Sequence, residues 1–240
     1  MSAPVPAPEV IVQIARVVRS HQGLRPLRLS ALAVARGERV AIQGVDAPAA
    51  EVLINLVTGA ALPDEGEVRV FGRATSEISS GDEWLASLDR FGIVSPRAVM
   101  MEGATVLQNL AMPFTLEIDP VPEATVRRVE SLAKASGIRL DALATRAGDL
   151  PADDRARVHL ARALALDPAL LLIEHPTAGV EKAAVPRLAD DFARALGARA
   201  ATALIVSQDE TFASRTASRR LILQPGTGEL KPVRKGWFSR

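Results

Sequence analysis

The sequence predicts an α/β fold with an inserted helical region, and three observations lead to this prediction. Short apolar runs alternate with amphipathic stretches along most of the chain, which is typical of strands and helices that share one core. The 240 residues are 48% hydrophobic, enough to bury the core of one large domain. A strand, a loop and a helix follow one another between residues 39 and 57, the setting in which phosphate-binding loops occur.

The first part of the chain is predicted to contain most of the strands. We expect strands at Val10 to Val18, Leu27 to Val34 and Arg39 to Gln43, and then a helix at Ala49 to Val57 with helical spacing of its apolar residues. After this helix, the turn residues lead into two further predicted strands, at Glu67 to Phe71 and Gly92 to Ser95.

The middle section, from Arg97 to Leu150, has a different pattern. Helices are expected at Thr105 to Met112 and Glu123 to Ser136, separated by prolines, and no strand pattern lies between them. This indicates a mostly helical insertion. The alternation then resumes with a predicted helix, strand, helix and strand at Asp154 to Leu166, Ala169 to Ile173, Ala184 to Leu196 and Thr202 to Val206.

Composition limits the possible partners and compartment. Lys and Arg number 29 against 28 Asp and Glu, so the net charge of +1 favours no nucleic-acid partner. The chain has no cysteine, which fits a reducing compartment. No apolar run approaches the ~18 residues of a membrane span, and the first ten residues lack the regions of a signal peptide. We therefore expect a cytoplasmic protein with a flexible lead at residues 1–8.

The end of the chain, residues 231–240, is basic and contains Trp237 and Phe238. Such a segment either contacts anionic lipid, where each basic residue contributes about 1 kcal/mol, or remains a solvated tail. The solvated tail is the expected case.

Six segments, in order from about Val10 to about Leu230, resemble the ATPase subunits of ABC transporters. These segments are GERVAIQGVDAPAAEVLINLVTG, LPDEGEVRVFG, FGIVSP, TVLQNLAMPF, LPADDRARVHLARALALDPALLLIEHPTAGVE and ALIVSQD. The resemblance implies one P-loop NTPase-like domain over residues 9–230. It implies a RecA-like core sheet flanked by helices, formed by residues 9–96 and 151–230, with a helical subdomain at about 97–150.

The segment at the phosphate-binding loop departs from the family pattern. A working loop, G-x-x-x-x-G-K-S/T, wraps backbone N–H groups around phosphates, adds a Lys and holds Mg2+ with a hydroxyl. Here Ala50 stands at the Lys position, Glu51 replaces the hydroxyl, and Pro48 lacks an N–H. The degenerate Walker A positions are Gly44, Val45, Asp46, Ala47, Pro48, Ala49, Ala50, Glu51 and Val52.

Charge at this loop is expected to oppose a triphosphate. Asp46 and Glu51 would repel it by about 1 kcal/mol at ~4 Å in water, and by several where solvent is partly excluded. The helix N-terminus favours anions by only roughly 0.3–1 kcal/mol. The alternative is structural: both carboxylates lie in the first helical turn and stabilise the helix dipole.

The resemblance places the other catalytic positions on altered residues. Glu174 stands for the Walker B Asp, His175 for the catalytic Glu and Gln208 for the H-loop His. The Gln208 amide could still hydrogen-bond a phosphate. Catalysis by His175 is not expected, because adjacent strand residues point to opposite sides and no phosphate is positioned for it.

Two further motif positions are altered in the same way. Pro96 replaces the Q-loop Gln, and the signature becomes Leu150, Pro151, Ala152, Asp153 and Asp154. Two carboxylates there would oppose a γ-phosphate. We interpret Asp153 and Asp154 as helix N-cap and first-turn residues instead.

These observations predict a cytoplasmic subunit of a membrane transport complex, held at the inner face of the membrane by a permease. The nucleotide site is expected to be degenerate, without ATP hydrolysis, resident metal or cofactor. The alternative is a subunit that binds and hydrolyses ATP with Mg2+ at a non-standard site. A further partner could be an intact ABC ATPase subunit.

Two consequences follow for such a complex. Because both halves of the site are altered, pairing with an intact subunit would leave neither composite site whole. This predicts a nucleotide-independent scaffold or an arrangement outside the usual dimer. Apolar residues in the helical insertion would either receive the permease or pack the subdomain core: Val99, Met100, Met101, Leu110 and Met112.

Overall fold

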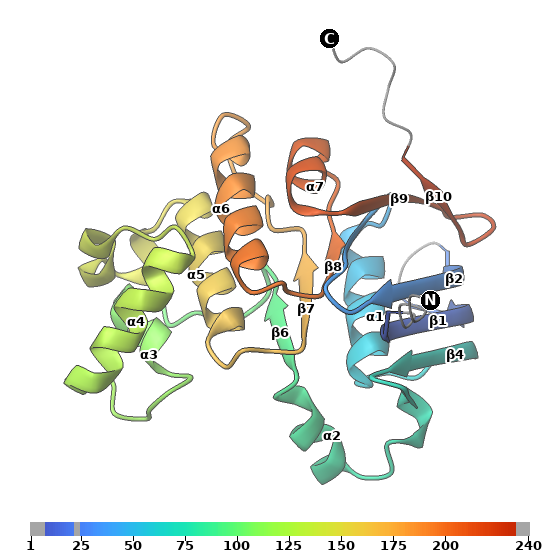
Figure 1. The fold of residues 1–240 in the computed structure, drawn as a ribbon, viewed down its shortest axis with the longest axis horizontal. Helices are drawn as coiled ribbons and strands as arrows, with labels where there is room; N and C mark the ends of the chain where they lie inside the picture. Colours follow the sequence, from blue (N-terminus) through green and yellow to red (C-terminus); the bar gives the residue numbers. More distant parts are fainter. Residues whose placement is uncertain (1–7, 22–24, 234–240) are drawn as a thin grey trace, which may run out of the picture.

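The computed structural model describes residues 8–21 and 25–233, which form two sheets with helices between and beside them (Figure 1). The smaller sheet is antiparallel, in the order β2-β1-β4-β5. Its strands are β1 (Val10–Arg19), β2 (Leu27–Ala35), β4 (Glu65–Val70) and β5 (Arg73–Ala74).

The larger sheet has the order β10-β9-β3-β8-β7-β6, and all its pairings are parallel except that of β10 with β9. Its central strands are buried on both faces, which explains their continuous apolar runs. The strands are β3 (Arg39–Gln43), β6 (Phe91–Val94), β7 (Leu170–Glu174), β8 (Ala203–Val206), β9 (Arg219–Gln224) and β10 (Glu229–Pro232).

Helix α1 (Ala47–Thr58) packs between the two sheets. Its buried residues Leu53, Leu56 and Val57 share one apolar cluster with β1, β2 and the strand residues Val40 and Ile42. This cluster fixes the position of the loop that precedes the helix.

The opposite face of the larger sheet is covered by helices. Ala41 and Ile173 point into this second cluster, where the rings of Phe192 and Phe212 meet edge to face at 5.1 Å. Figure 1 shows α5 and α6 beside the sheet and α3 and α4 beyond them. The helices are α3 (Val106–Ala111), α4 (Glu123–Ala135), α5 (Ala152–Leu164), α6 (Val185–Ala198) and α7 (Glu210–Thr216), with 3-10 helices η2 (Leu140–Ala144) and η3 (Ala147–Asp149).

Most predicted elements are confirmed within two residues, and the differences have local causes. Helix α1 begins at Ala47 rather than Ala49, because Asp46 caps it. The expected tail at residues 231–240 is partly wrong, since Lys231 and Pro232 belong to β10. Trp237, Phe238 and most of the expected lead lie outside the described residues.

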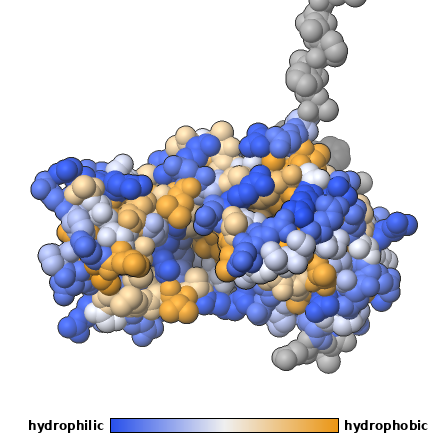
Figure 2. Space-filling model, turned by 90° about the horizontal axis from the view of Figure 1, so that it is seen from below, coloured by the Kyte–Doolittle hydropathy of each residue, from blue (hydrophilic) through white to orange (hydrophobic). Residues whose placement is uncertain are grey.

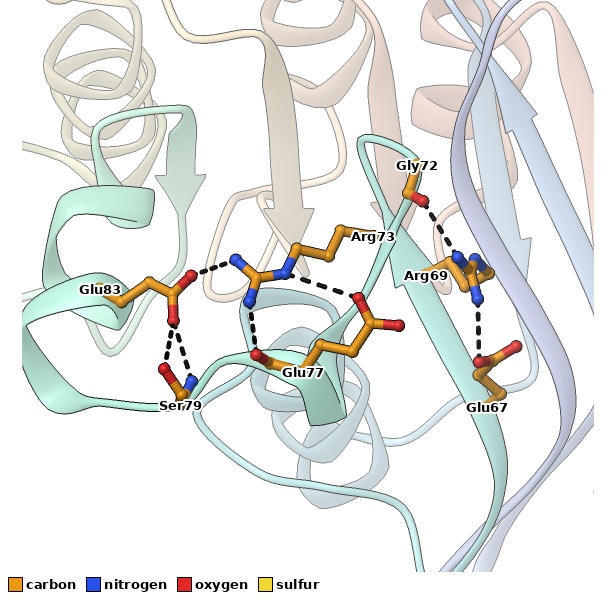
Figure 3. Close-up of polar contacts among 7 residues, drawn as sticks. All are labelled: Glu67, Arg69, Gly72, Arg73, Glu77, Ser79 and Glu83. Carbon is orange, nitrogen blue, oxygen red and sulfur yellow. Dashed lines mark hydrogen bonds and ion pairs between the residues drawn. The ribbon is translucent and has the colours of Figure 1, made fainter.

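The sequence interpretation missed helix α2 (Gly81–Leu88). None of the side chains of this helix is fully buried. Its Trp84 Nε1 donates to the Thr58 carbonyl of α1 at 3.0 Å. Charged contacts also join it to the preceding segment, which includes the 3-10 helix η1 (Thr75–Glu77) (Figure 3). Arg73 pairs with Glu83 and Glu77, and both the N–H and the hydroxyl of Ser79 donate to Glu83. The hydrogen bond from Arg73 lowers the pKa of Glu83 from 4.5 to about 2. Among the described residues, no helix has the length and apolar character needed to span a bilayer.

Two glycines provide a matched test of backbone packing. Gly66 has φ +84°, and a Cβ there would lie 2.3 Å from the Arg16 carbonyl oxygen, at an irregularity in the β1–β4 register. Gly72 has φ +83° with no atom within 4 Å of such a Cβ. Gly72→Ala should cost about 1–2 kcal/mol of unfolding free energy from the backbone conformation alone. Gly66→Ala should cost a further 1–3 kcal/mol, roughly, because strand backbone must move.

Urea unfolding of both variants measures this difference. Equal losses in the two variants would contradict the contact described at Gly66.

Candidate functional site

The predicted site residues meet at one edge of the larger sheet. Parallel strands place their carboxyl ends together, and the loops after β3, β6, β7 and β8 all leave from this edge. Gly44, Ser95, His175 and Gln208 follow these four strands. The sequence prediction that segments far apart along the chain form one site therefore agrees with the strand order.

The N-terminus of α1 is capped from within the chain. The Asp46 carboxylate accepts a hydrogen bond from the Ala49 N–H at 2.9 Å, and Pro48 lies in the first turn, where its missing N–H costs little. Asp46 is thus the N-cap residue, one position before the first turn in which the structural interpretation placed it. The same interpretation of Glu51 is wrong, because α1 starts at Ala47 and Glu51 lies in its second turn.

The Gln208 amide closes the start of the loop. Its Oε1 accepts from the Gly44 N–H at 3.3 Å, and its Nε2 donates to the Val45 carbonyl at 2.7 Å. Both ends of the side chain are therefore used on the loop backbone. That Gln208 hydrogen-bonds a phosphate stays a prediction, which would depend on the second N–H of its Nε2.

Arg97 occupies the centre of the site. Its guanidinium lies 2.6 Å from a Glu51 oxygen and 2.7 Å from a Glu174 oxygen, and so bridges the two carboxylates. Glu174 is 1% exposed and also accepts from the Ser95 hydroxyl at 2.9 Å. Burial alone would lower the pKa of Arg97, but the hydrogen bond to Glu174 and the charges of both glutamates raise this pKa above the ordinary value of an arginine.

The bridge changes the expected electrostatics. Repulsion by Glu51 was predicted from its sequence position, whereas in the structure Arg97 compensates this charge. Arg97 was not identified from the sequence. A signal was present in the sequence, because Arg97 directly follows Pro96. The chain also has carboxylates, Glu51 and Glu174, at the two positions where the family holds Mg2+.

His175 lies outside the strand. Its φ of +39° takes the backbone out of β7, so the argument that strand alternation separates it from Glu174 does not apply. Its backbone N–H donates to the Val206 carbonyl, and its Nε2 is buried without a hydrogen-bond partner. That His175 is not a catalyst stays a prediction.

The signature positions are also compensated internally. Arg157 is 3% exposed and lies 2.7 Å from Asp153, 2.9 Å from Asp154 and 2.8 Å from Asp191. Both aspartates lie in the first turn of α5, as predicted, but the N-cap residue is Pro151. Leu150 is buried and Ala152 begins the helix.

These residues do not fit a magnesium nucleotide. A cavity of about 640 Å³ remains beside Gly44, bounded also by His21, Arg28 and Gln208, so space is not the obstacle. The obstacle is chemical: Ala50 supplies no amine, Asp46 already binds a loop N–H, and Arg97 lies between the carboxylates. We therefore derive no phosphoryl-transfer step from this site.

The mixed sheet, the loop at its carboxyl edge and the helix that follows define a P-loop NTPase-like α/β fold, as the sequence predicted. Among solved structures, the dimeric ATP-binding cassette MJ0796 bound to ADP and Pi has a TM-score of 0.75, with 21% identity over 94% of this chain and 100% of that chain. The cbiO1 protein of Clostridium perfringens, part of the complex cbiONQ, has a TM-score of 0.73, with 20% identity over 93% and 87%. Both support the fold.

Sequence comparisons identify the family. A model of the family described as ABC transporter matches residues 27–178. LolD of Chromohalobacter salexigens, an ATP-binding protein of the lipoprotein-releasing system, is 34% identical over 154 residues, 63% of each chain. MetN of Brucella abortus, a methionine import ATP-binding protein, is 30% identical over 90% of this chain and 58% of its own. The chain belongs to the ABC transporter family.

Removing Arg97 should reveal how strongly the site depends on it. In Arg97→Met, the buried Glu174 carboxylate keeps only the Ser95 hydroxyl, and we expect a loss of about 1–3 kcal/mol in urea unfolding. Arg127→Met removes an exposed pair with Glu123 on α4 and should cost about 0.5 kcal/mol or less.

The same variant has a second readout. Two carboxylates without their cation form oxygen ligands for a hard divalent ion. Mn2+ should raise the Tm of Arg97→Met and leave that of the wild type unchanged. If Mn2+ acts equally on both proteins, Arg97 does not hold the position of a cation.

His159 on α5 was missed by the sequence interpretation and sets an acid limit on stability. It is 6% exposed, and burial, followed by the charges of Arg162 and Arg155, lowers its pKa from 6.5 to about 4. Below pH 6.5 His159 becomes protonated in the unfolded chain, whereas in the folded chain it becomes protonated only near pH 4. Stability should therefore fall as pH decreases across this window, by up to about 3 kcal/mol.

His159→Leu should reduce the loss of unfolding free energy between pH 6.5 and 4. Any packing effect of leucine changes the unfolding free energy equally at pH 7.5. The comparison therefore uses the dependence of the unfolding free energy on pH and not its absolute value. An unchanged slope would show that His159 does not stay neutral in the folded protein.

Proposed function

We propose that this protein is a nucleotide-independent subunit of an ABC-type membrane transport complex. One observation carries the proposal: the Arg97 guanidinium lies between Glu51 and Glu174, at the two positions where the family arrangement holds Mg2+. The cation that a nucleotide site receives together with its ligand is here a side chain of the protein.

Binding of Mg-ATP at this loop would break contacts that the chain already makes. The ligand would have to displace the two ion pairs of Arg97, the Asp46 cap and both hydrogen bonds of Gln208. Hydrogen bonds to charged groups are worth about 1.5–3 kcal/mol each. No Lys is present at position 50 to compensate these losses.

The signature half supports the same conclusion. Asp153 and Asp154 face Arg157 rather than an approaching phosphate. If the chain pairs with an intact ABC ATPase subunit, it contributes an altered half to both composite sites. We therefore favour a scaffold, or an arrangement outside the usual sandwich dimer.

The proposed partner is a membrane permease subunit, which would hold the protein at the cytoplasmic face of the membrane and select the transported solute. Val99 and Met101 are exposed by 82% and 47%. Leu110 is fully buried, and Met100 packs against the core, so these two serve packing instead.

A hollow near these exposed residues supports permease docking. The cavity of about 320 Å³ lies between the start of β6 and the end of α5, and its lining includes Ile93, Pro113 and Leu166. Figure 2 shows apolar residues gathered around a hollow on this face. An apolar helix of the permease is the occupant that such a surface suits.

A second candidate function is favoured by the open cavity beside Gly44 and by the ATP-binding descriptions of the relatives. In that case the chain binds and hydrolyses ATP with Mg2+ at a non-standard site.

Calorimetric titration of the purified protein with Mg-ATP separates the two functions. We expect no saturable heat and no Mg2+-dependent phosphate release, because the ammonium group is absent and Arg97 holds the metal position. LolD of Chromohalobacter salexigens serves as the ATP-binding control. Micromolar affinity together with hydrolysis that disappears in His175→Ala would establish the enzyme instead.

A further inference from the structure

A separate cavity of about 340 Å³ lies between the end of β6, the start of α5 and the turn after β7. No residue of the loop at 44–52 lines it. Its walls are mostly apolar, with Val94 and Ala156 as examples, and its polar groups include Arg155, His159 and His175. A few polar groups in an apolar cavity of this size are typical of a small-molecule site.

Some nitrogen atoms of the residues that line this cavity lack hydrogen-bond partners among the described residues. The His159 ring is 94% buried, and no hydrogen bond to it occurs among the described residues. Nε2 of His175 and Nε of Arg155 are buried and unpaired as well. Each unpaired buried donor costs about 1–3 kcal/mol, so two such nitrogens on residues that line one cavity indicate that an acceptor is missing.

The local charge identifies the acceptor as an anion. Arg155 forms no ion pair among the described residues, and its guanidinium makes one hydrogen bond, from Nη2 to the Leu150 carbonyl at 3.3 Å. No carboxylate lines the cavity among the described residues, and Glu174 and Asp153 pair with Arg97 and Arg157. An anion entering the cavity therefore meets one cation and two imidazoles.

We propose that this cavity binds a small oxyanion, a carboxylate or a phosphate, through Arg155, His159 and His175. The guanidinium supplies charge-assisted hydrogen bonds, and each imidazole donates an N–H. The apolar walls exclude water from these contacts and strengthen them. The site is independent of the Gly44 loop, so it can exist whether or not the protein binds ATP.

The chain contains only three histidines, which makes the test direct. Two of them, His159 and His175, line this cavity, whereas His21 borders the cavity beside Gly44. Imidazole proton–carbon NMR spectra, assigned with single histidine variants, would follow titrations with acetate, succinate and inorganic phosphate. Sodium chloride at matched ionic strength is the salt control.

We expect saturable shifts of the His159 and His175 signals with at least one probe, while the His21 signal stays in place. Comparing the affinities for acetate and succinate with the affinity for phosphate distinguishes a carboxylate ligand from a phosphate ligand. Arg155→Gln should weaken binding at least about tenfold, because the charge-assisted hydrogen bonds are lost. Arg155→Lys keeps the charge and should bind with intermediate affinity, and Arg127→Gln on the exposed face of α4 should bind normally.

Three results would overturn the proposal. They are the absence of a saturable shift with every probe, equal movement of all three histidine signals, and unchanged affinity in Arg155→Gln. None of these results tests nucleotide binding, so the proposed function is tested separately by the titration with Mg-ATP.

Discussion

The ion pairs of Arg97 with Glu51 and Glu174 are the constraint on which this site depends. Glu174 lies at the end of a buried strand and is 1% exposed, and an ionised carboxylate in that position requires a nearby positive charge. Arg97 supplies it from the loop after β6, and Glu51 supplies a second carboxylate from α1. Three segments that are distant in the sequence are thereby held together at one edge of the sheet.

This arrangement changes how stability and ligands are related. Where a site receives its cation with a bound ligand, the stability that the folded state gains depends on the ligand concentration and rises with its logarithm. A guanidinium belonging to the chain is present at all times. Arg157 likewise supplies a permanent positive charge near the start of α5, where it pairs with Asp153, Asp154 and Asp191. In both places the acidic side chains are thus paired with an arginine of the same chain.

The sequence predicted the fold better than the site, and particular residues explain why. Strand β3 and helix α1 have local apolar patterns that follow directly from their burial on both sides. Helix α2 was missed because it has no fully buried side chain and several of its contacts are charged and exposed, as the pair of Arg73 with Glu83 illustrates. Arg97 was missed because its partners lie 46 and 77 positions away, and no local pattern reports such a pairing.

Gly44 shows how a motif residue can remain necessary after its chemical partners are gone. Its φ of +80° favours glycine, and a Cβ there would lie 3.0 Å from the Leu223 carbonyl oxygen of β9. The loop geometry is therefore required by the packing of β3 against β9, independently of any phosphate. The core of α1 likewise depends on Leu53, Leu56 and Val57, none of which would contact a nucleotide through the loop. Packing and chemistry therefore depend on different residues here, so the shape of the fold does not depend on which groups occupy the positions of Glu51 and Glu174.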